Sequence, residues 1–173
     1  MLKPFLLTAA LLCMSFSMNR CEAQSAPPIQ HSYIVFGNRT AIISEAGQIA
    51  WEHTGGSRDG FVLPNGNILI AWSNRVQEVT RDKQVVFEWT LSQENREIGT
   101  AQRLYNGNTL VTELGPKPRL LEITPQGTMA AEVTLQPETE NAHMQTRMAR
   151  QLRNGNFLVP HLLAFSVQEY AAD

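Results

Sequence analysis

The string Leu-x-Asn-Gly-Asn occurs three times in this chain, and it constrains the fold more than any other feature. The copies begin at Leu63, Leu104 and Leu152, and alternating apolar residues flank each one. Asn-Gly in that setting is the strongest short signal for a β-hairpin, because a type I′ turn needs positive φ at both central positions. We therefore expect three hairpins, whose strands cover residues 60–63 and 68–72, 100–104 and 109–113, and 149–152 and 157–161. Their turns fall at Asn65 and Gly66, Asn106 and Gly107, and Asn154 and Gly155.

A second repeated unit follows each of these hairpins. VQEVTRDKQVVFEW begins at Val76, LLEITPQGTMAAEV at Leu120 and VQEYAAD at Val167, while TAIISEAGQIAWEH from Thr40 aligns with them ahead of the first Asn-Gly hairpin. The longer copies each predict a strand, a turn and another strand. Two hairpins per unit give four short antiparallel strands, and the Asn-Gly pairs lie 41 and 48 residues apart. This period of about 40–50 residues is typical of a β-propeller blade.

The fold class that follows is all-β: a β-propeller of four-stranded antiparallel blades, with about three and a half blades present. In the alignment of repeats Asp173 matches Asp82 and Gln126, so the sequence is expected to stop at a turn, as a truncated propeller does. The alternative is an open array of about four sheets with an exposed edge, which would tend to pair with another chain.

The first 23 residues have the features of an export signal. Lys3 precedes an apolar stretch from Phe5 to Met18, and cleavage is expected after Ala23. The predicted organisation is a signal peptide at 1–23, a linker at 24–32 and a partial propeller domain at 33–173. The apolar stretch is too short to remain as a membrane span. Both cysteines, Cys13 and Cys21, lie in the signal, so disulfide, thiolate-zinc and cysteine-nucleophile chemistry is excluded for the mature chain.

Charge and motifs exclude several further classes of function. The net charge is −2 and no basic run occurs, which disfavours nucleic acid as a partner. The sequence has no phosphate loop, dinucleotide fingerprint, zinc-protease motif or calcium loop. We therefore predict no cofactor, no metal site and no catalytic residues.

Strings such as LPNGNILIA and NRVQEVTRDKQVVFEW resemble a known group of proteins. They are similar to the exported bacterial propellers described as pyrroloquinoline-quinone (PQQ)-like repeat proteins, and their hairpins resemble those of arylsulfotransferase-type propellers. The resemblance covers about residues 33–173. It implies a propeller fold, and its motifs belong to the blade and not to an active site.

The sulfotransferase part of the resemblance would imply an enzymatic mechanism, in which a histidine on one face of the propeller accepts a sulfuryl group. In that family histidines stand just ahead of an Asn-Gly hairpin. Here the corresponding strings are SRDGFV from Ser57, GTAQR from Gly99 and RMARQ from Arg147, and none contains a histidine.

The connection between blades points to a candidate ligand site. Its length grows along the chain from 14 to 19 to 23 positions, and added residues in loops often carry function. The longest connection contains His143, Gln145 and Arg147, and His161 follows the next turn. If the stretch is extended, positions i, i+2 and i+4 share one face and present donors to an anion or a sugar hydroxyl. The alternative is a polar connection whose side chains bond to neighbouring blades.

Two other sets of residues allow both a structural and a binding role. Arginine precedes the second hairpin in three copies, at Arg39, Arg75 and Arg119, and we expect these arginines to pair with the recurring glutamates Glu78, Glu122 and Glu169. Trp51 and Trp89 are expected in the core between blades, whereas Trp72 remains a candidate stacking residue for a ligand.

The leading functional hypothesis is an exported, non-catalytic propeller scaffold that binds an unidentified ligand or protein partner in the periplasm, at the cell surface or outside the cell. The alternative is part of a propeller enzyme of arylsulfotransferase or quinoprotein type, whose active site needs further blades.

Overall fold

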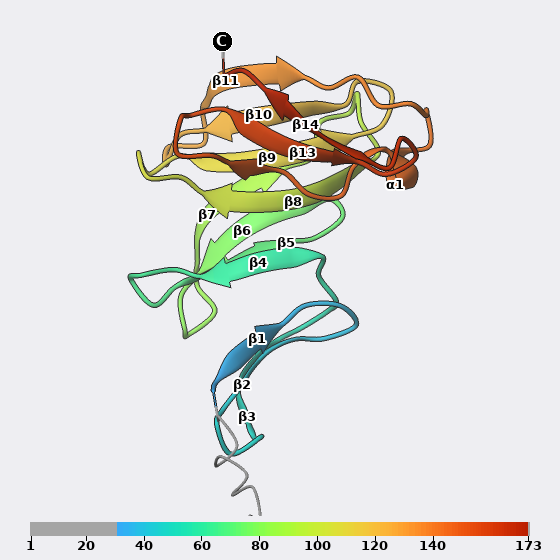
Figure 1. Cartoon of the computed structure of the whole chain (residues 1–173). Helices are drawn as coiled ribbons and strands as arrows, with labels where there is room; N and C mark the ends of the chain where they lie inside the picture. The colour runs from blue at the N-terminus through green and yellow to red at the C-terminus, as the bar shows by residue number, and fades with distance from the viewer. Residues whose placement is uncertain (1–30, 173) are drawn as a thin grey trace, which may run out of the picture.

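The computed structural model describes residues 31–172, so the predicted signal peptide and most of the predicted linker lie outside the described part. Four antiparallel sheets are formed, each with its strands in sequence order. In Figure 1 the first sheet lies at the bottom, the second above it, and the third and fourth at the top. The predicted all-β propeller architecture is confirmed, with four strands in each of the two middle sheets.

The strands are short, as expected for propeller blades. The first sheet contains β1 (Tyr33–Val35), β2 (Thr40–Ile43) and β3 (Ile49–His53). The second contains β4 (Asp59–Val62), β5 (Ile68–Ala71), β6 (Arg75–Val79) and β7 (Val85–Thr90). The third contains β8 (Glu97–Arg103), β9 (Thr109–Leu114), β10 (Arg119–Ile123) and β11 (Met129–Thr134). The fourth contains β12 (Arg150–Gln151), β13 (Phe157–His161) and β14 (Ser166–Tyr170), preceded by the helical turn α1 (Ala142–Gln145).

Apolar side chains from facing sheets form the core. One cluster joins the first and second sheets and includes Trp51, Ile68 and Ile70. A second joins the second and third sheets, and Trp89 packs against it, so both tryptophans lie where the sequence predicted. A third cluster, around Leu110, joins the third and fourth sheets. Every pair of successive sheets is therefore joined by its own apolar cluster.

The Asn-Gly turns occur where expected, but the predicted turn type is wrong. The Leu63 carbonyl accepts a hydrogen bond from the Gly66 amide at 2.9 Å, and the Leu63 amide donates to the Asn67 carbonyl at 2.8 Å. Gly66 has a φ of 86°, while Asn65 is not among the residues with positive φ. This is a type I turn followed by a left-handed glycine, the usual three-residue hairpin loop with a bulge. Three residues separate the bonded positions, which is one too many for a type I′ turn.

The two asparagines of each motif explain why the glutamate recurs. Asn65 and Asn67 both donate their side-chain amides to Glu78 Oε1, at 3.2 and 2.6 Å. The same arrangement joins the next two turns to Glu122 and Glu169. The predicted pairing of these glutamates with the repeated arginines is therefore wrong, because the asparagines of the neighbouring turn are closer along the same sheet.

The repeated arginines have other partners. Arg39 pairs with Glu52 at 3.0 Å. The guanidinium of Arg75 lies 4.4 Å from the centre of the Trp72 ring. Arg119 pairs with several carboxylates of the third sheet and of the connection that precedes it. The arginines are thus structural, as the sequence favoured, although each is held by a different set of groups.

Candidate functional site

The first strands of three successive sheets converge on one cavity. β4 contacts β8, and Arg150 of β12 reaches back to Asp59 of β4, with 2.9 Å between Nη2 and Oδ2. Residues 57–59, 99–100 and 147–148 line a cavity of about 390 Å³ at this point. Positions 58, 99 and 147 are 41 and 48 residues apart, the same spacings as the Asn-Gly pairs. We call this the axial cavity, because equivalent inner positions of consecutive blades surround the axis of a propeller.

Two arginines give the axial cavity a cationic lining. Arg58 donates from Nη2 to Glu97 Oε2 at 2.6 Å and from Nη1 to the Ile98 carbonyl at 2.9 Å. Arg147 is exposed, and among residues 31–172 no carboxylate lies within ion-pair distance of its guanidinium. One cation is thus neutralised inside the site and the other faces solvent.

Glu97 keeps Arg58 neutralised over the physiological pH range. Burial raises the pKa of this carboxyl group, but the hydrogen bond and the charge of Arg58, together with the charge of His143, outweigh burial and hold the pKa below its ordinary value. His143 Nδ1 lies 3.5 Å from the other carboxylate oxygen, Oε1. Because Glu97 stays ionised, Arg147 is left as the cation available to a ligand.

His143 and Arg147 come together in a way that the sequence did not predict. The Asn141 side chain accepts a hydrogen bond from the His143 amide at 3.2 Å and caps the helical turn α1. The chain leaves the helical turn at Thr146, and Arg147 Nη2 lies 3.4 Å from His143 Nδ1. The condition for a shared face, that the whole stretch is extended, is therefore not met, and its third residue, Gln145, points away from the other two.

Gln145 is a structural clamp and does not line the axial cavity. Its side chain is 2% exposed. The side-chain oxygen accepts from the Gly115 amide at 2.9 Å, and the nitrogen donates to the Gly115 carbonyl at 2.8 Å. Gly115 has a φ of 145°, and a Cβ there would lie 2.8 Å from the Arg96 nitrogen, so this loop is held in a conformation that favours glycine.

The other two predicted ligand residues are also buried elsewhere. His161 is 1% exposed, with Nδ1 at 3.0 Å from Glu138 Oε1 and Nε2 at 2.9 Å from the Tyr170 hydroxyl. Trp72 is 6% exposed and contacts the ring of His53. With Glu113, these residues occupy equivalent positions near the end of the second blade strand. The structure thus brings His143 and Arg147 together and separates them from Gln145, His161 and Trp72.

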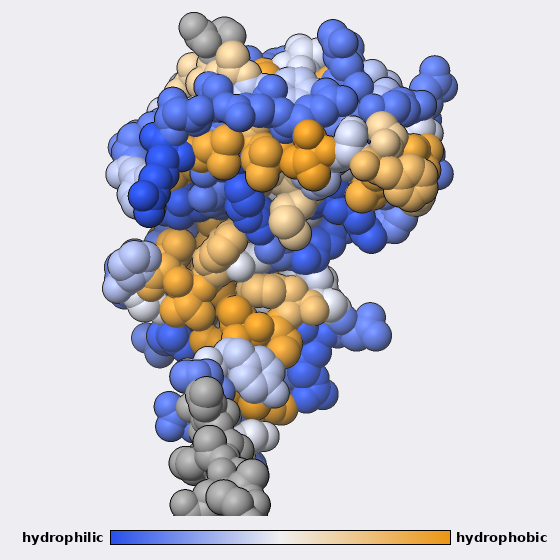
Figure 2. Space-filling view, in the orientation of Figure 1, coloured by the Kyte–Doolittle hydropathy of each residue, from blue (hydrophilic) through white to orange (hydrophobic). Residues whose placement is uncertain are grey.

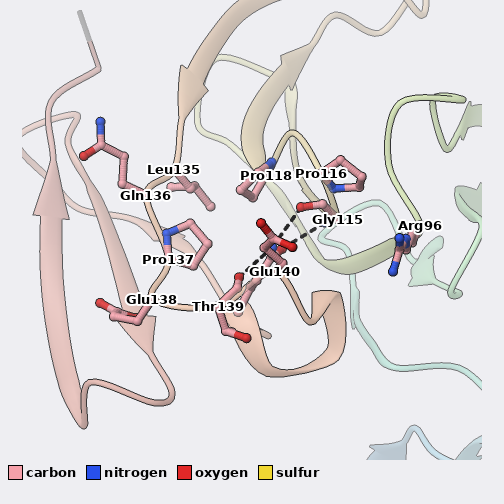
Figure 3. A pocket seen from close by; sticks show the side chains of 11 residues that line it. Arg96, Gly115, Pro116, Pro118, Leu135, Gln136, Pro137, Glu138, Thr139 and Glu140 are labelled. Atoms are coloured by element: carbon pink, nitrogen blue, oxygen red, sulfur yellow. Dashed lines mark hydrogen bonds between the residues drawn. The ribbon is translucent and has the colours of Figure 1, made fainter.

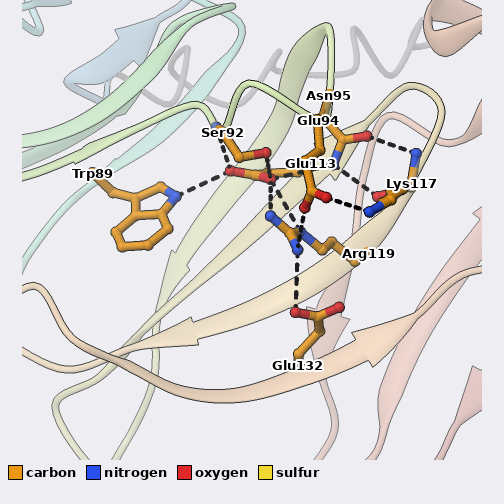
Figure 4. A network of polar contacts seen from close by, with 8 residues as sticks. All are labelled: Trp89, Ser92, Glu94, Asn95, Glu113, Lys117, Arg119 and Glu132. Carbon is orange, nitrogen blue, oxygen red and sulfur yellow. Dashed lines mark hydrogen bonds and ion pairs between the residues drawn. The ribbon is translucent and has the colours of Figure 1, made fainter.

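Glu113 is the centre of a buried polar network that joins the second and third sheets (Figure 4). Its carboxylate is 0% exposed and accepts from the Trp89 indole, from the amide and hydroxyl of Ser92, and from Asn95. Arg119 adds two further hydrogen bonds, at 3.1 and 3.0 Å. Burial raises the pKa of Glu113, but the bonds from Ser92, Asn95 and Arg119 outweigh burial, so the pKa lies below its ordinary value. Every strong acceptor site of the carboxylate is occupied, which indicates a structural role.

A second hollow borders the first part of the long connection (Figure 3). It has a volume of about 560 Å³. Its lining combines three prolines, Pro116, Pro118 and Pro137, with the acidic residues Glu138 and Glu140. The connection of residues 135–149 therefore borders two hollows, the acidic one here and the cationic axial cavity.

Sequence reasoning missed Arg58, which lines the axial cavity, and Glu97, which pairs with Arg58. The repeat spacing contained the signal for Arg58, since this residue is equivalent to Arg147 once the repeats are aligned. Glu97 carried no such signal, because its role depends on a contact between strands of different sheets. Within residues 31–172 no group of three or more His, Cys, Asp or Glu side chains is arranged to hold a metal ion. Over the same range no helix has the length and apolar character needed to span a membrane.

Comparisons with known proteins support the fold and a distant sequence relationship. No protein-family model matches the chain. Outer membrane protein assembly factor BamB of Escherichia coli is 32% identical over 103 residues, which cover 56% of this chain and 26% of BamB. BamB of Shigella dysenteriae matches equally. The chain thus spans about a quarter of the length of the curated relatives it matches.

Solved structures match a larger share of this chain than BamB does. A protein of unknown function from Bacteroides caccae is 27% identical, with a TM-score of 0.73, over 83% of this chain and 54% of that one. The WD40 β-propeller domain of Doa1 aligns over 83% of this chain and 48% of its own, with a TM-score of 0.65 and 10% identity, which shows the fold alone. The chain therefore has the fold of a β-propeller and sequence similarity to BamB, while the arylsulfotransferase resemblance gains no support.

Proposed function

We propose that this chain is an exported propeller scaffold whose axial cavity binds an acidic group of a ligand or of a protein partner. One observation carries the proposal: equivalent positions of three consecutive blades line a single cavity, and arginine occupies two of those three positions, at Arg58 and Arg147. Repeated cations around one cavity favour anionic ligands.

The charges at the cavity leave one of these cations free for binding. Glu97 neutralises Arg58 at 2.6 Å and Asp59 pairs with Arg150 at 2.9 Å. Arg147 forms no ion pair with any of residues 31–172, and the imidazole of His143 lies 3.4 Å from its guanidinium. An incoming carboxylate, phosphate or sulfate would therefore meet an exposed guanidinium and a neighbouring imidazole.

The similarity to BamB bears on the class of partner. The name of that relative states a role in assembling outer membrane proteins. A protein partner with an acidic segment suits both this similarity and the charge of the axial cavity. Export follows from the signal-like sequence at residues 1–23.

Binding is tested by titrating the purified chain with a fluorescent hexaglutamate peptide, with hexaglutamine as the uncharged control. Arg147→Ala is expected to weaken hexaglutamate binding roughly fivefold, the equivalent of about 1 kcal/mol for one partly shielded ion pair. Arg153→Ala is the matched control, since Arg153 is exposed in the Asn-Gly turn of the fourth sheet. Equal affinities for the two variants would refute the assignment of the site.

Export is tested separately by fractionating bacterial cells that express the tagged chain. We expect the chain outside the cytoplasm, with an N-terminus at Gln24. A cytoplasmic chain that retains residues 1–23 would refute export and leave the binding result unaffected.

A further inference from the structure

The fourth sheet exposes an apolar face. The equivalent faces of the second and third sheets are buried. Side chains alternate along a strand, so Phe157 and Val159 of β13 face the third sheet while Leu158 and Pro160 face the other way. Val167 of β14 pairs with Pro160 and shares that outer face. Leu158 is 39% exposed and Val167 is 61% exposed. Figure 2 shows the apolar surface over β13 and β14 on the side turned to the viewer.

The repeat register identifies what normally covers this face. Leu158 is equivalent to Leu69 of the second sheet and Leu110 of the third, because each pairs with the recurring glutamate of its sheet. Both equivalents are at most 1% exposed, and each lies in the core that joins its sheet to the following one.

Val167 follows the same rule. Its equivalents are Val76 and Leu120, which pair with Ala71 and Thr112 as Val167 pairs with Pro160. Val76 is 0% exposed and Leu120 is 1% exposed. The exposed face of the fourth sheet therefore has the composition of a surface that another propeller sheet covers.

The first sheet carries a complementary apolar face. Ile34 and Ile42 pack against the second sheet. By strand alternation Tyr33, Val35 and Ile43 lie on the opposite side. Tyr33 is 56% exposed and the other two are half-buried. In the second sheet the equivalents of Tyr33 and Val35 are Ile68 and Ile70, which are 0% exposed and contact the preceding sheet.

We propose that a second copy of this chain covers both faces, with the fourth sheet of each copy packed on the first sheet of the other. Residues 31–172 form four consecutive sheets, so two copies would close a ring of eight, within the usual range of about 4–8 blades. Two head-to-tail contacts related by a two-fold axis form a closed ring and not an open filament. The contact continues the same sheet-on-sheet packing that already joins the first sheet to the second.

The test is the oligomeric state of the purified chain, measured by sedimentation equilibrium together with circular dichroism to check folding. The expected species is a dimer. The double variant Leu158→Glu, Val167→Glu is expected to raise the dimer dissociation constant at least about 100-fold, because it places unpaired charges in a buried contact. Both positions are exposed in one copy, so the variant should fold. Val86→Glu is the matched control, since Val86 is a 54% exposed apolar residue of β7 in the second sheet, away from both faces.

A separate variant tests the head-to-tail arrangement. Tyr33→Glu, on the first sheet, should weaken the dimer as well, because the first sheet supplies the other half of each contact. A monomer at about 100 µM, a dimer that persists in the double variant, or a dimer that Tyr33→Glu leaves unchanged would each overturn the proposal. Loss of the dimer in Val86→Glu would also overturn it, because the contact would then involve another surface.

Discussion

Replacing Glu113 with glutamine should destabilise this protein more than the loss of an exposed ion pair would. The substitution keeps the size of the side chain and removes its charge. Trp89 and the Ser92 amide donate to Oε1, while the Ser92 hydroxyl, Asn95 and Arg119 donate to Oε2. In either orientation of the new amide, its NH₂ group meets at least two donors. Arg119 also loses its buried counter-charge.

The expected loss of stability is about 3–5 kcal/mol, the typical cost of removing one partner from a buried ion pair. That is a large share of the roughly 5–15 kcal/mol that stabilises an average domain. At about 2–4 °C per kcal/mol for a chain of this size, Tm should fall by on the order of 10 °C. Glu132→Gln is the control. Glu132 contacts the same Arg119 at 3.2 Å, but its side chain is 37% exposed, so this variant should lose at most about 1 kcal/mol.

The measurement is urea unfolding followed by tryptophan fluorescence at several pH values. The pKa of Glu113 is lowered by folding, so its contribution to stability is present above its unfolded pKa and is lost as pH falls through the folded pKa. The gap between wild type and Glu113→Gln should therefore be constant near neutral pH and shrink as pH falls below about 4.5, the ordinary value. Equal destabilisation by Glu113→Gln and Glu132→Gln, or a gap that does not change with pH, would refute this account.

Two further predictions concern the backbone. Lys83 has a φ of 66° in a turn whose equivalent residues are glycines, so Lys83→Gly should stabilise the chain by about 1 kcal/mol in urea unfolding, and a loss of stability would contradict the strain argument. Gln145→Leu leaves the amide and carbonyl of Gly115 without partners and should cost about 2–4 kcal/mol, against almost no change for the exposed Gln136→Leu. Thermal unfolding distinguishes these two variants, and equal midpoints would contradict the clamp.

Much of the fold was predictable from the sequence, because local features specify it. The three Asn-Gly pairs fix the ends of the hairpins, and the alternation of apolar residues fixes which side chains enter the core. The turn type was missed because it depends on which backbone groups bond across the turn. The Leu63 amide bonds to the Asn67 carbonyl, one residue farther along the chain than the partner that it has in a type I′ hairpin.

The candidate site was predictable only in part. The growing insert led to His143 and Arg147, and the structure places both beside the axial cavity. It also separates Gln145 from them, because the capped turn α1 takes the place of the extended conformation that a shared face would need. A single helical turn of four residues leaves little periodicity in a sequence, and a capping asparagine alone does not distinguish it from a loop.

The sequence by itself determined the repeated four-stranded unit, its spacing and the residues that face the core, since each of these follows from contacts close along the chain. Only the tertiary structure decided that Arg58, just ahead of the second sheet, and Arg147, ahead of the fourth, line one cavity, and that Glu97 of the third sheet pairs with Arg58. These residues are tens of positions apart, and their distance depends on how whole sheets pack against one another. The same packing decided that Glu113 became a buried carboxylate where the second and third sheets meet.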